Sequence, residues 1–117
     1  MGNGALLKSS VESRPDITSA SIISKGKTME MYGRPDVSMP PEADLKRIFL
    51  QVELMVGMIT TNERAVGDTR FTMILHASLT VIIVPVKTGK SLGVVFAAFE
   101  DVEGLAKRVL EQAALVS

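Results

Sequence analysis

The segment from Met39 to Thr61 constrains the fold more than any other part of the chain, because its sequence predicts one long helix with apolar residues on two sides. Ser38 is a suitable N-cap residue, proline is tolerated in a first turn, and Glu42 and Asp44 suit the positive end of the helix dipole. One apolar stripe follows the three- and four-residue spacing of a helix face and is expected to cover a sheet. This stripe consists of Leu45, Ile48, Phe49, Val52, Met55, Val56 and Ile59.

A second apolar stripe lies on the back of the same helix, where a helix that faces water carries charged residues. It consists of Leu50, Leu54, Gly57 and Met58. Hydrophobic residues make up 46% of the chain and the mean hydropathy is +0.27, which is high for a small domain whose surface needs polar residues. We therefore expect a partner to cover the second stripe, so that the chain is a subunit of an oligomer.

The remaining sequence predicts strands joined by tight turns, with a short helix near each end of the chain. The two hairpin turns are 25–27 and 87–90, since glycine supplies the positive φ that such turns need. At 117 residues the chain is expected to be one domain, 1–117, with an α/β (α+β) fold, a mostly antiparallel sheet and the order α-β-β-α-β-β-β-α. The predicted helices are 4–13, 39–61 and 101–115, and the predicted strands are 17–24, 28–32, 69–76, 79–86 and 92–99.

Side-chain alternation predicts which strand residues share one face of the sheet. The first strand places Ile17, Ser19, Ser21 and Ile23 on one face. The third strand places Phe71, Met73 and Leu75 on one face. The segment 64–68 is expected to be a loop with its turn at Gly67.

The composition argues against several classes of protein. The 13 basic and 13 acidic residues balance, and only five aromatic residues (four Phe and one Tyr) are available for base stacking, so we expect no nucleic-acid partner. The absence of cysteine excludes disulfides and thiolate sites and fits a reducing cytoplasm. No apolar run reaches the roughly 18 residues of a membrane span, so we expect no such span. The first residues lack a charged region followed by an apolar one, so we expect no secretory signal.

Two local patterns invite a catalytic interpretation but have simpler explanations. The sequence 88–91 (TGKS) resembles the end of a phosphate-binding loop, but Val84 stands where that motif needs glycine, and a hairpin turn explains it better. His76 is the only histidine. Asp68 and Ser78 are the acid and the nucleophile that a triad would add, but a lone histidine more often has a structural role.

The carboxylates Glu100, Asp101 and Glu103 cluster at the start of the last predicted helix. They suit metal binding in principle, but capping and compensation of the helix dipole explain them more simply. Because no set of nucleophile, base and acid can be assembled, we expect the protein not to be an enzyme and to hold neither a cofactor nor a metal.

Four stretches together resemble the roadblock family of dynein light-chain and GTPase-partner proteins. They are ITSASIISKGKTMEMYG, PPEADLKRIFLQVELMVGMI, TVIIVPVKTGKSLGVVFAAF and DVEGLAKRVLEQAA, and the resemblance covers roughly 5–114. The family fold has a five-stranded antiparallel sheet between one long helix and two shorter ones, with a profilin-like topology. The resemblance therefore implies this fold for the present chain.

The resemblance also implies a non-catalytic homodimer that binds a Ras-like small GTPase as a scaffold or regulator in a prokaryotic cytoplasm. Two subunits would join edge to edge through the strand 69–76, with their long helices side by side. The residues implied in the dimer interface are Leu50, Leu54, Gly57, Met58, Phe71 and Met73. Any arginine supplied to the GTPase would have to be exposed, and the candidates are Arg34, Arg64 and Arg70.

The alternative function is a small-molecule sensory or ligand-binding module of profilin-like or PAS-like topology. Such a module needs a cavity between the sheet and a helix, with polar groups directed into it. The dense packing expected of Val, Ile and Ala in the two central strands argues against such a cavity.

Overall fold

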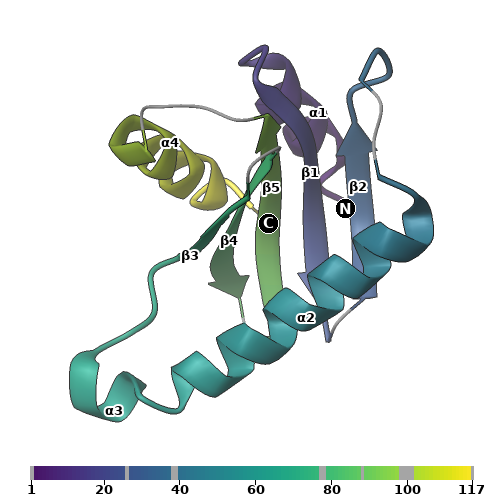
Figure 1. Cartoon of the computed structure of the whole chain (residues 1–117). Coiled ribbons are helices and arrows are strands. Elements are labelled where there is room, and N and C mark those ends of the chain that lie inside the picture. The colour runs from purple at the N-terminus through teal and green to yellow at the C-terminus, as the bar shows by residue number, and fades with distance from the viewer. Residues whose placement is uncertain are drawn as a thin grey trace.

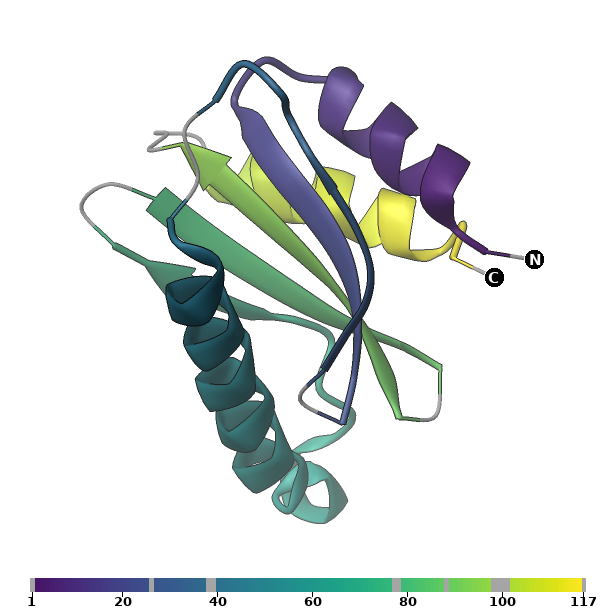
Figure 2. The same ribbon diagram turned by 90° about the vertical axis from the view of Figure 1, so that its right-hand side faces the viewer.

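The computed structural model describes residues 2–25, 27–37, 40–76, 79–87, 89–97 and 102–116. Its helices are α1 (Gly4–Glu12), α2 (Glu42–Thr60), α3 (Glu63–Val66) and α4 (Val102–Ala113). Its strands are β1 (Ile17–Ser24), β2 (Lys27–Gly33), β3 (Thr72–Leu75), β4 (Leu79–Lys87) and β5 (Lys90–Ala97). The strands form one antiparallel sheet in the order β2-β1-β5-β4-β3. Helix α2 lies on one face of the sheet, and α1 and α4 lie on the other (Figures 1 and 2). The predicted architecture is confirmed.

Each face of the sheet carries its own buried cluster of apolar side chains. The cluster beneath α1 and α4 is the larger one and extends from Leu7 and Val11 of α1 to Val109 of α4. The cluster beneath α2 is smaller and consists of Ile23, Phe49, Val52, Val81, Ile83 and Val95. A single helix therefore covers its face of the sheet less completely than the two helices cover theirs.

The centre of the α2 face is tightly packed because Gly93 of β5 has no side chain. A Cβ atom added there would lie 2.9 Å from Cδ1 of Ile23, 3.1 Å from Cδ1 of Ile83 and 3.6 Å from the Phe49 ring. Gly93 thus leaves room for the Cδ1 methyl groups of Ile23 and Ile83, while Phe49, which is fully buried, lies at ordinary contact distance. This dense centre agrees with the packing predicted for the central strands.

One predicted strand face is wrong at a single residue. Ile17 packs with Ala20 and Ile22 in the cluster beneath α1 and α4, whereas Ile23 packs beneath α2. The reason is a shift in the pairing of β1 with β5 between Ile17 and Ser19, which breaks the strict alternation of faces.

Several element boundaries differ from the prediction. Helix α2 begins at Glu42 with Pro41 at the N-cap position, while Ser38 and Met39 lie outside the described residues. A short helix, α3, occupies most of the predicted loop 64–68, although the turn at Gly67 (φ 92°) is confirmed. Strand β3 covers only the middle of the predicted strand 69–76. The end of the predicted strand 92–99 and the predicted cap Asp101 also lie outside the described residues.

Candidate protein-interaction site

The second half of α2 projects past the sheet, and α3 follows it away from the body of the fold (Figures 1 and 2). Leu54 and Met58 are 61% and 72% exposed, and Val66 of α3 is 81% exposed. Met55 and Ile59, which the helical spacing assigned to the sheet-covering stripe, are also exposed, at 45% and 40%. That part of the prediction is wrong because Met55 lies on a flank of the helix, beside a groove, and Ile59 lies in the part of the helix that projects past the sheet. The stripe is buried or half-buried only at Leu45, Ile48, Phe49, Val52 and Val56.

The two flanks of α2 face different strands. Leu50 lies on the flank toward β2, where it lines a groove of about 840 Å³. Met55 lies on the opposite flank, where a second groove of about 470 Å³ is lined by residues of α2, β3, β4 and His76. Leu54 and Met58 lie between the two flanks and point away from the sheet. The predicted back stripe is thus exposed in the single chain. It runs from the β2 flank of α2 to the side of the helix that faces away from the sheet.

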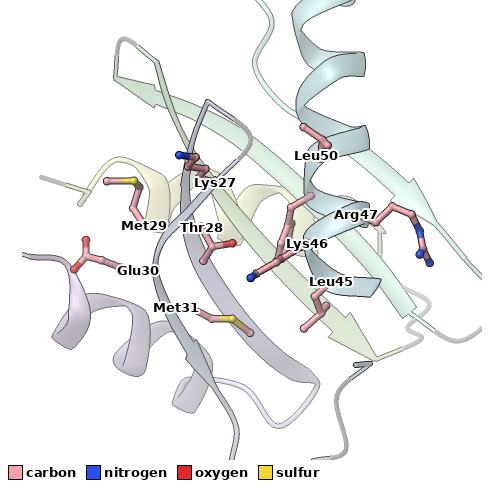
Figure 3. A pocket seen from close by; sticks show the side chains of 10 residues that line it. Lys27, Thr28, Met29, Glu30, Met31, Leu45, Lys46, Arg47 and Leu50 are labelled. Carbon is pink, nitrogen blue, oxygen red and sulfur yellow. The ribbon is translucent and has the colours of Figure 1, made fainter. Parts of the chain in front are cut away.

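The groove beside β2 is lined by residues of that strand and of the first half of α2 (Figure 3). We call it the β2–α2 groove. Its lining consists of Lys27, Thr28, Met29, Glu30, Met31, Leu45, Lys46, Arg47, Phe49 and Leu50. No sequence pattern indicated this groove, since Met29 and Met31 resembled ordinary alternating strand residues and only their exposure, 59% and 42%, marks them. The dense central packing that argued against a cavity is present, but the groove lies at the edge of the sheet.

The other two residues of the predicted interface, Phe71 and Met73, lie at the opposite edge of the sheet. Both are half-buried against the cluster beneath α1 and α4. Ile74, one position further along β3, packs instead toward α2. Because neighbouring residues of a strand point to opposite faces, Phe71 and Met73 are not on the same face of the sheet as Leu50 and Leu54. The two parts of the predicted interface are therefore not brought together within one chain.

Strand β3 forms one end of the sheet and pairs with β4. No strand of the described residues pairs with its outer edge, which leaves its backbone groups on that side available to a partner. The flank of α2 that carries Met55 lies on the same side of the molecule as this edge. An exposed apolar helix flank and an open strand edge therefore adjoin each other.

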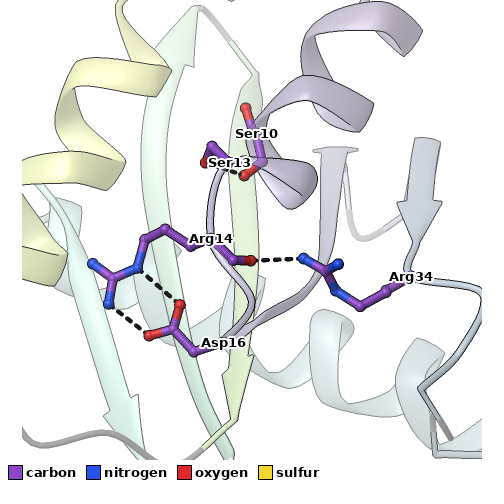
Figure 4. Close-up of polar contacts among 5 residues, drawn as sticks. All are labelled: Ser10, Ser13, Arg14, Asp16 and Arg34. Atoms are coloured by element: carbon purple, nitrogen blue, oxygen red, sulfur yellow. Dashed lines mark hydrogen bonds and ion pairs between the residues drawn. The ribbon is translucent and has the colours of Figure 1, made fainter.

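Arg34 is not available to a partner in the way the sequence suggested. Its guanidinium donates hydrogen bonds to the carbonyl oxygens of Val11 (2.5 Å), Arg14 (2.6 Å) and Ile17 (3.1 Å). Figure 4 shows the bond to Arg14. This side chain holds the end of α1 against the end of β2. Arg64 and Arg70 are exposed and stay candidates.

The loop that returns from α3 to β3 is held by Glu63. Its carboxylate accepts a hydrogen bond from the backbone N–H of Thr69. This bond, and one with the Thr69 side chain, lower the pKa of Glu63 below its ordinary value of 4.5. The charge of Glu63 therefore fixes the path of the chain into the open edge strand.

The patterns considered for catalysis do not form a reaction centre in the described residues. Of the sequence 88–91, Thr88 lies outside the described residues, Gly89 has a φ of 76° between β4 and β5, and Ser91 is buried in β5, which supports a hairpin turn. His76 is exposed and its backbone N–H donates to the carbonyl of Leu79 (2.8 Å). Asp68 is an exposed loop residue, and Ser78, Glu100 and Asp101 lie outside the described residues. No helix in the described ranges has the length and apolar character needed to cross a bilayer.

Solved structures share this architecture. A Roadblock/LC7 domain from Streptomyces avermitilis superposes with a TM-score of 0.75 over 97% of this chain and 92% of that chain, at 16% identity. The chain has the Roadblock/LC7 fold. The gliding protein MglB from Thermus thermophilus has a TM-score of 0.72 at 16% identity, covering 94% of this chain and 84% of its own. MglC from Myxococcus xanthus has a TM-score of 0.65 at 11% identity, covering 97% and 94%.

No protein-family model and no curated protein matches the sequence. The likeness to Roadblock/LC7 domains is therefore one of fold at low sequence identity, and it confirms the fold that the family resemblance implied.

Proposed function

We propose that this chain is a non-catalytic adaptor that forms a homodimer in the cytoplasm and binds a Ras-like small GTPase. The observation that carries the proposal is the exposed apolar second half of α2 beside an open β3 edge, in a chain with the Roadblock/LC7 fold. Apolar side chains exposed in such a group on one helix are typical of a surface that a partner covers.

The dimer we propose joins the two β3 strands as antiparallel neighbours across a two-fold axis. In such a dimer both α2 helices lie on the same face of the extended sheet, and the flank of each helix that is nearer to β3 meets the other helix. That flank carries Met55 and Ile59, which are four residues apart and hence on one side of the helix. The four residues of β3 offer few backbone hydrogen bonds, so the apolar helix flank has to supply most of the binding free energy.

The GTPase would bind on the outer surface of the helix pair. Leu54 and Met58 point away from the sheet and are among the most exposed apolar side chains of the described residues. In the proposed dimer they line the top of the paired helices, where two copies of the stripe form one continuous apolar platform. The family resemblance implies a different contact between the helices, through Leu50, Leu54, Gly57 and Met58, and this stays a prediction. Substitutions on the two flanks of α2 distinguish it from a contact through Met55 and Ile59.

The test is a binding assay with purified Ras-like GTPases of the source organism, each loaded with GDP or with a non-hydrolysable GTP analogue. We expect the wild-type dimer to retain a GTPase in one nucleotide state, and Leu54→Asp to reduce retention by about tenfold or more without changing the mass of the dimer. Leu115→Asp is the matched control, because Leu115 is equally exposed (65%) but follows α4 on the other face. Failure of every GTPase to bind in either state would refute the proposed partner.

A ligand-binding module is the second candidate function, and the β2–α2 groove is the observation that favours it, since its volume of about 840 Å³ falls in the range of small-molecule sites. Most of its lining residues are exposed, however, which is unlike a site that encloses a small ligand. A small-molecule site would raise the melting temperature of the protein when the ligand is added, whereas an adaptor alone would show no such shift.

A further inference from the structure

The β1–β2 and β4–β5 hairpins lie at the same end of the sheet (Figure 2). At this end Ser24 of β1 pairs with Lys27 of β2 on one side and with Lys90 of β5 on the other. Side chains of residues that are paired across antiparallel strands lie on the same face of a sheet. Two lysines therefore flank a serine hydroxyl across three strands, and we call Lys27, Ser24 and Lys90 the lysine row. On β4 the backbone partner of Lys90 is Lys87.

The lysine row faces away from α2. Ile23, the neighbour of Ser24, packs in the cluster beneath α2, so Ser24 points to the opposite face of the sheet. Lys27 is exposed, and Ser24 and Lys90 are half-buried, so the row is accessible to a ligand. It lies on the other face of the sheet from the platform proposed for a GTPase.

Lys25 adds a further cation beside Ser24, in an unfavourable backbone conformation. Its φ is 52°, in the left-handed region that few residues other than glycine, asparagine and aspartate adopt. A residue held there costs conformational energy, and such residues gather at ligand sites. A lysine at this position therefore indicates a use for its charge.

The positive charge at this end of the sheet is not neutralised within the described residues. No ion pair joins Lys25 or the lysines of the row to an acidic side chain there. Glu30 of β2 is on the same face, since its partner Ile22 packs beneath α1 and α4. Its carboxylate instead accepts hydrogen bonds from the backbone N–H (2.7 Å) and the side-chain amide (3.3 Å) of Asn3. Because like charges repel, an anion bound between the lysines would stabilise this end of the sheet.

The chemistry of the lysine row suits a chain of phosphate groups. Lysine binds phosphate as a point charge, and the Ser24 hydroxyl can donate a hydrogen bond to a phosphate oxygen. The Cα atoms of Lys27 and Lys90 are two strand spacings apart, roughly 10 Å, so an anion with several charges in line can meet both ammonium groups. The row runs across the strands instead of along a strand edge, so an acidic peptide that followed it would gain no backbone hydrogen bonds.

We propose that this end of the sheet binds a small linear polyphosphate, either inorganic triphosphate or the phosphate chain of a nucleoside triphosphate. Lys27 and Lys90 contact the chain from its two ends, and Ser24 donates to a phosphate oxygen between them. Lys25 contacts the chain from the turn. The site uses none of the residues assigned to the dimer or to the GTPase platform, so it does not depend on the proposed function.

The test uses sodium triphosphate and isotope-labelled full-length protein, observed by NMR at constant ionic strength without divalent cations. We expect saturable shifts of the backbone amide signals of Ser24, Lys25, Lys27 and Lys90. Inorganic phosphate should bind at least about tenfold more weakly, since it carries fewer charges. ATP and GTP identify the source of the phosphate chain. Affinities equal to that of triphosphate mean that the chain alone is recognised, and a tighter nucleotide means that the site also contacts the nucleoside.

Substitutions test the assigned residues. Lys27→Glu with Lys90→Glu should weaken triphosphate binding by about tenfold or more. Lys8→Glu with Lys107→Glu, at exposed positions of α1 and α4, changes the net charge equally and should alter binding by less than about twofold. Ser24→Ala should weaken binding by about fivefold, as for the loss of one hydrogen bond. The amide spectrum of each variant shows whether it is folded, and Lys27→Gln with Lys90→Gln serves if the glutamate variant is not.

Several outcomes would overturn the proposal. Sulfate that binds as tightly as triphosphate would show an adventitious ion only. Shifts confined to other parts of the protein, or equal weakening in the two charge-reversal variants, would assign binding to the general surface charge. Retention on phosphatidylserine vesicles or binding of a poly-glutamate peptide, in the absence of triphosphate binding, would assign the lysines to a membrane or a protein partner instead.

Discussion

The guanidinium of Arg34, which follows a strand of the sheet, lies 2.5 Å from the carbonyl oxygen of Val11, in a helix packed on that sheet. Val11 is in the last turn of α1, whose final carbonyls have no partner within the helix. The positive charge of Arg34 also compensates the negative end of that helix dipole. A residue that follows β2 thereby caps α1, and the same side chain reaches Arg14 and Ile17.

Replacing Arg34 should therefore destabilise the protein. We expect Arg34→Met to lower the free energy of unfolding by about 2 kcal/mol, because carbonyl groups near the end of α1 lose a charged hydrogen-bond donor. Chemical denaturation followed by circular dichroism measures this change. Arg64→Met, at an exposed position of α3, is the matched control and should change the stability by less than about 0.5 kcal/mol. An equal effect of the two substitutions would contradict the capping role.

Gly93→Ala tests the packing of α2 on the sheet. The added methyl group would lie 2.9 Å from Cδ1 of Ile23 and 3.1 Å from Cδ1 of Ile83, so both of these side chains have to move beneath Phe49. We expect a loss of about 1–3 kcal/mol in the free energy of unfolding, as for other overpacked cores. Thermal unfolding reports the effect, and an unchanged melting temperature would show that the side chains repack without cost.

The sequence was sufficient to predict the order of the elements other than α3, and the core residues of α2 near the sheet, because periodicity records which side of a helix is apolar. It was insufficient at Met55 and Ile59, since periodicity records neither how wide a stripe the sheet covers nor where the sheet beneath the helix ends. Ile17 was misplaced because a pairing shift between strands leaves no local signal. The role of Arg34 depends on contacts between residues up to 23 positions apart, which spacing alone does not reveal.

Gly57→Ala tests whether the two α2 helices of the dimer meet through the flank of Met55 and Ile59 or through the stripe that contains Gly57. An added Cβ atom at Gly57 meets no atom of the described residues within 4 Å, and alanine is the better helix former, so we expect a gain of about 0.5–1 kcal/mol in stability. Gly57 lies two residues after Met55 and hence roughly 200° around the helix. The proposed dimer should therefore keep its mass in light scattering. Dissociation would show instead that the helices approach each other at Gly57, as the family resemblance implies.

The hydrogen bond between Glu63 and Thr69 should depend on pH. Because the pKa of Glu63 is lowered in the folded protein, the bond stabilises the loop at pH above the ordinary value of 4.5 and is lost as the pH falls through the lower folded-state value. The amide proton signal of Thr69 should move upfield in that acid range. In Glu63→Gln the signal should not titrate, and a Thr69 signal that stays constant with pH in the wild type would show that the bond does not form.

Two pairs of substitutions decide which flank of α2 meets the second copy. Met55→Asp with Ile59→Asp places two carboxylates on the flank nearer to β3, where desolvating them in a helix contact would be costly, so we expect a monomer in size-exclusion chromatography with light scattering. Leu50→Asp with Leu54→Asp places the same charges, at the same four-residue spacing, on the flank nearer to β2 and the top of the helix, and this variant should stay dimeric. The opposite outcome would assign the helix contact to the back stripe, and a wild-type protein that is monomeric at all concentrations would remove the dimer itself.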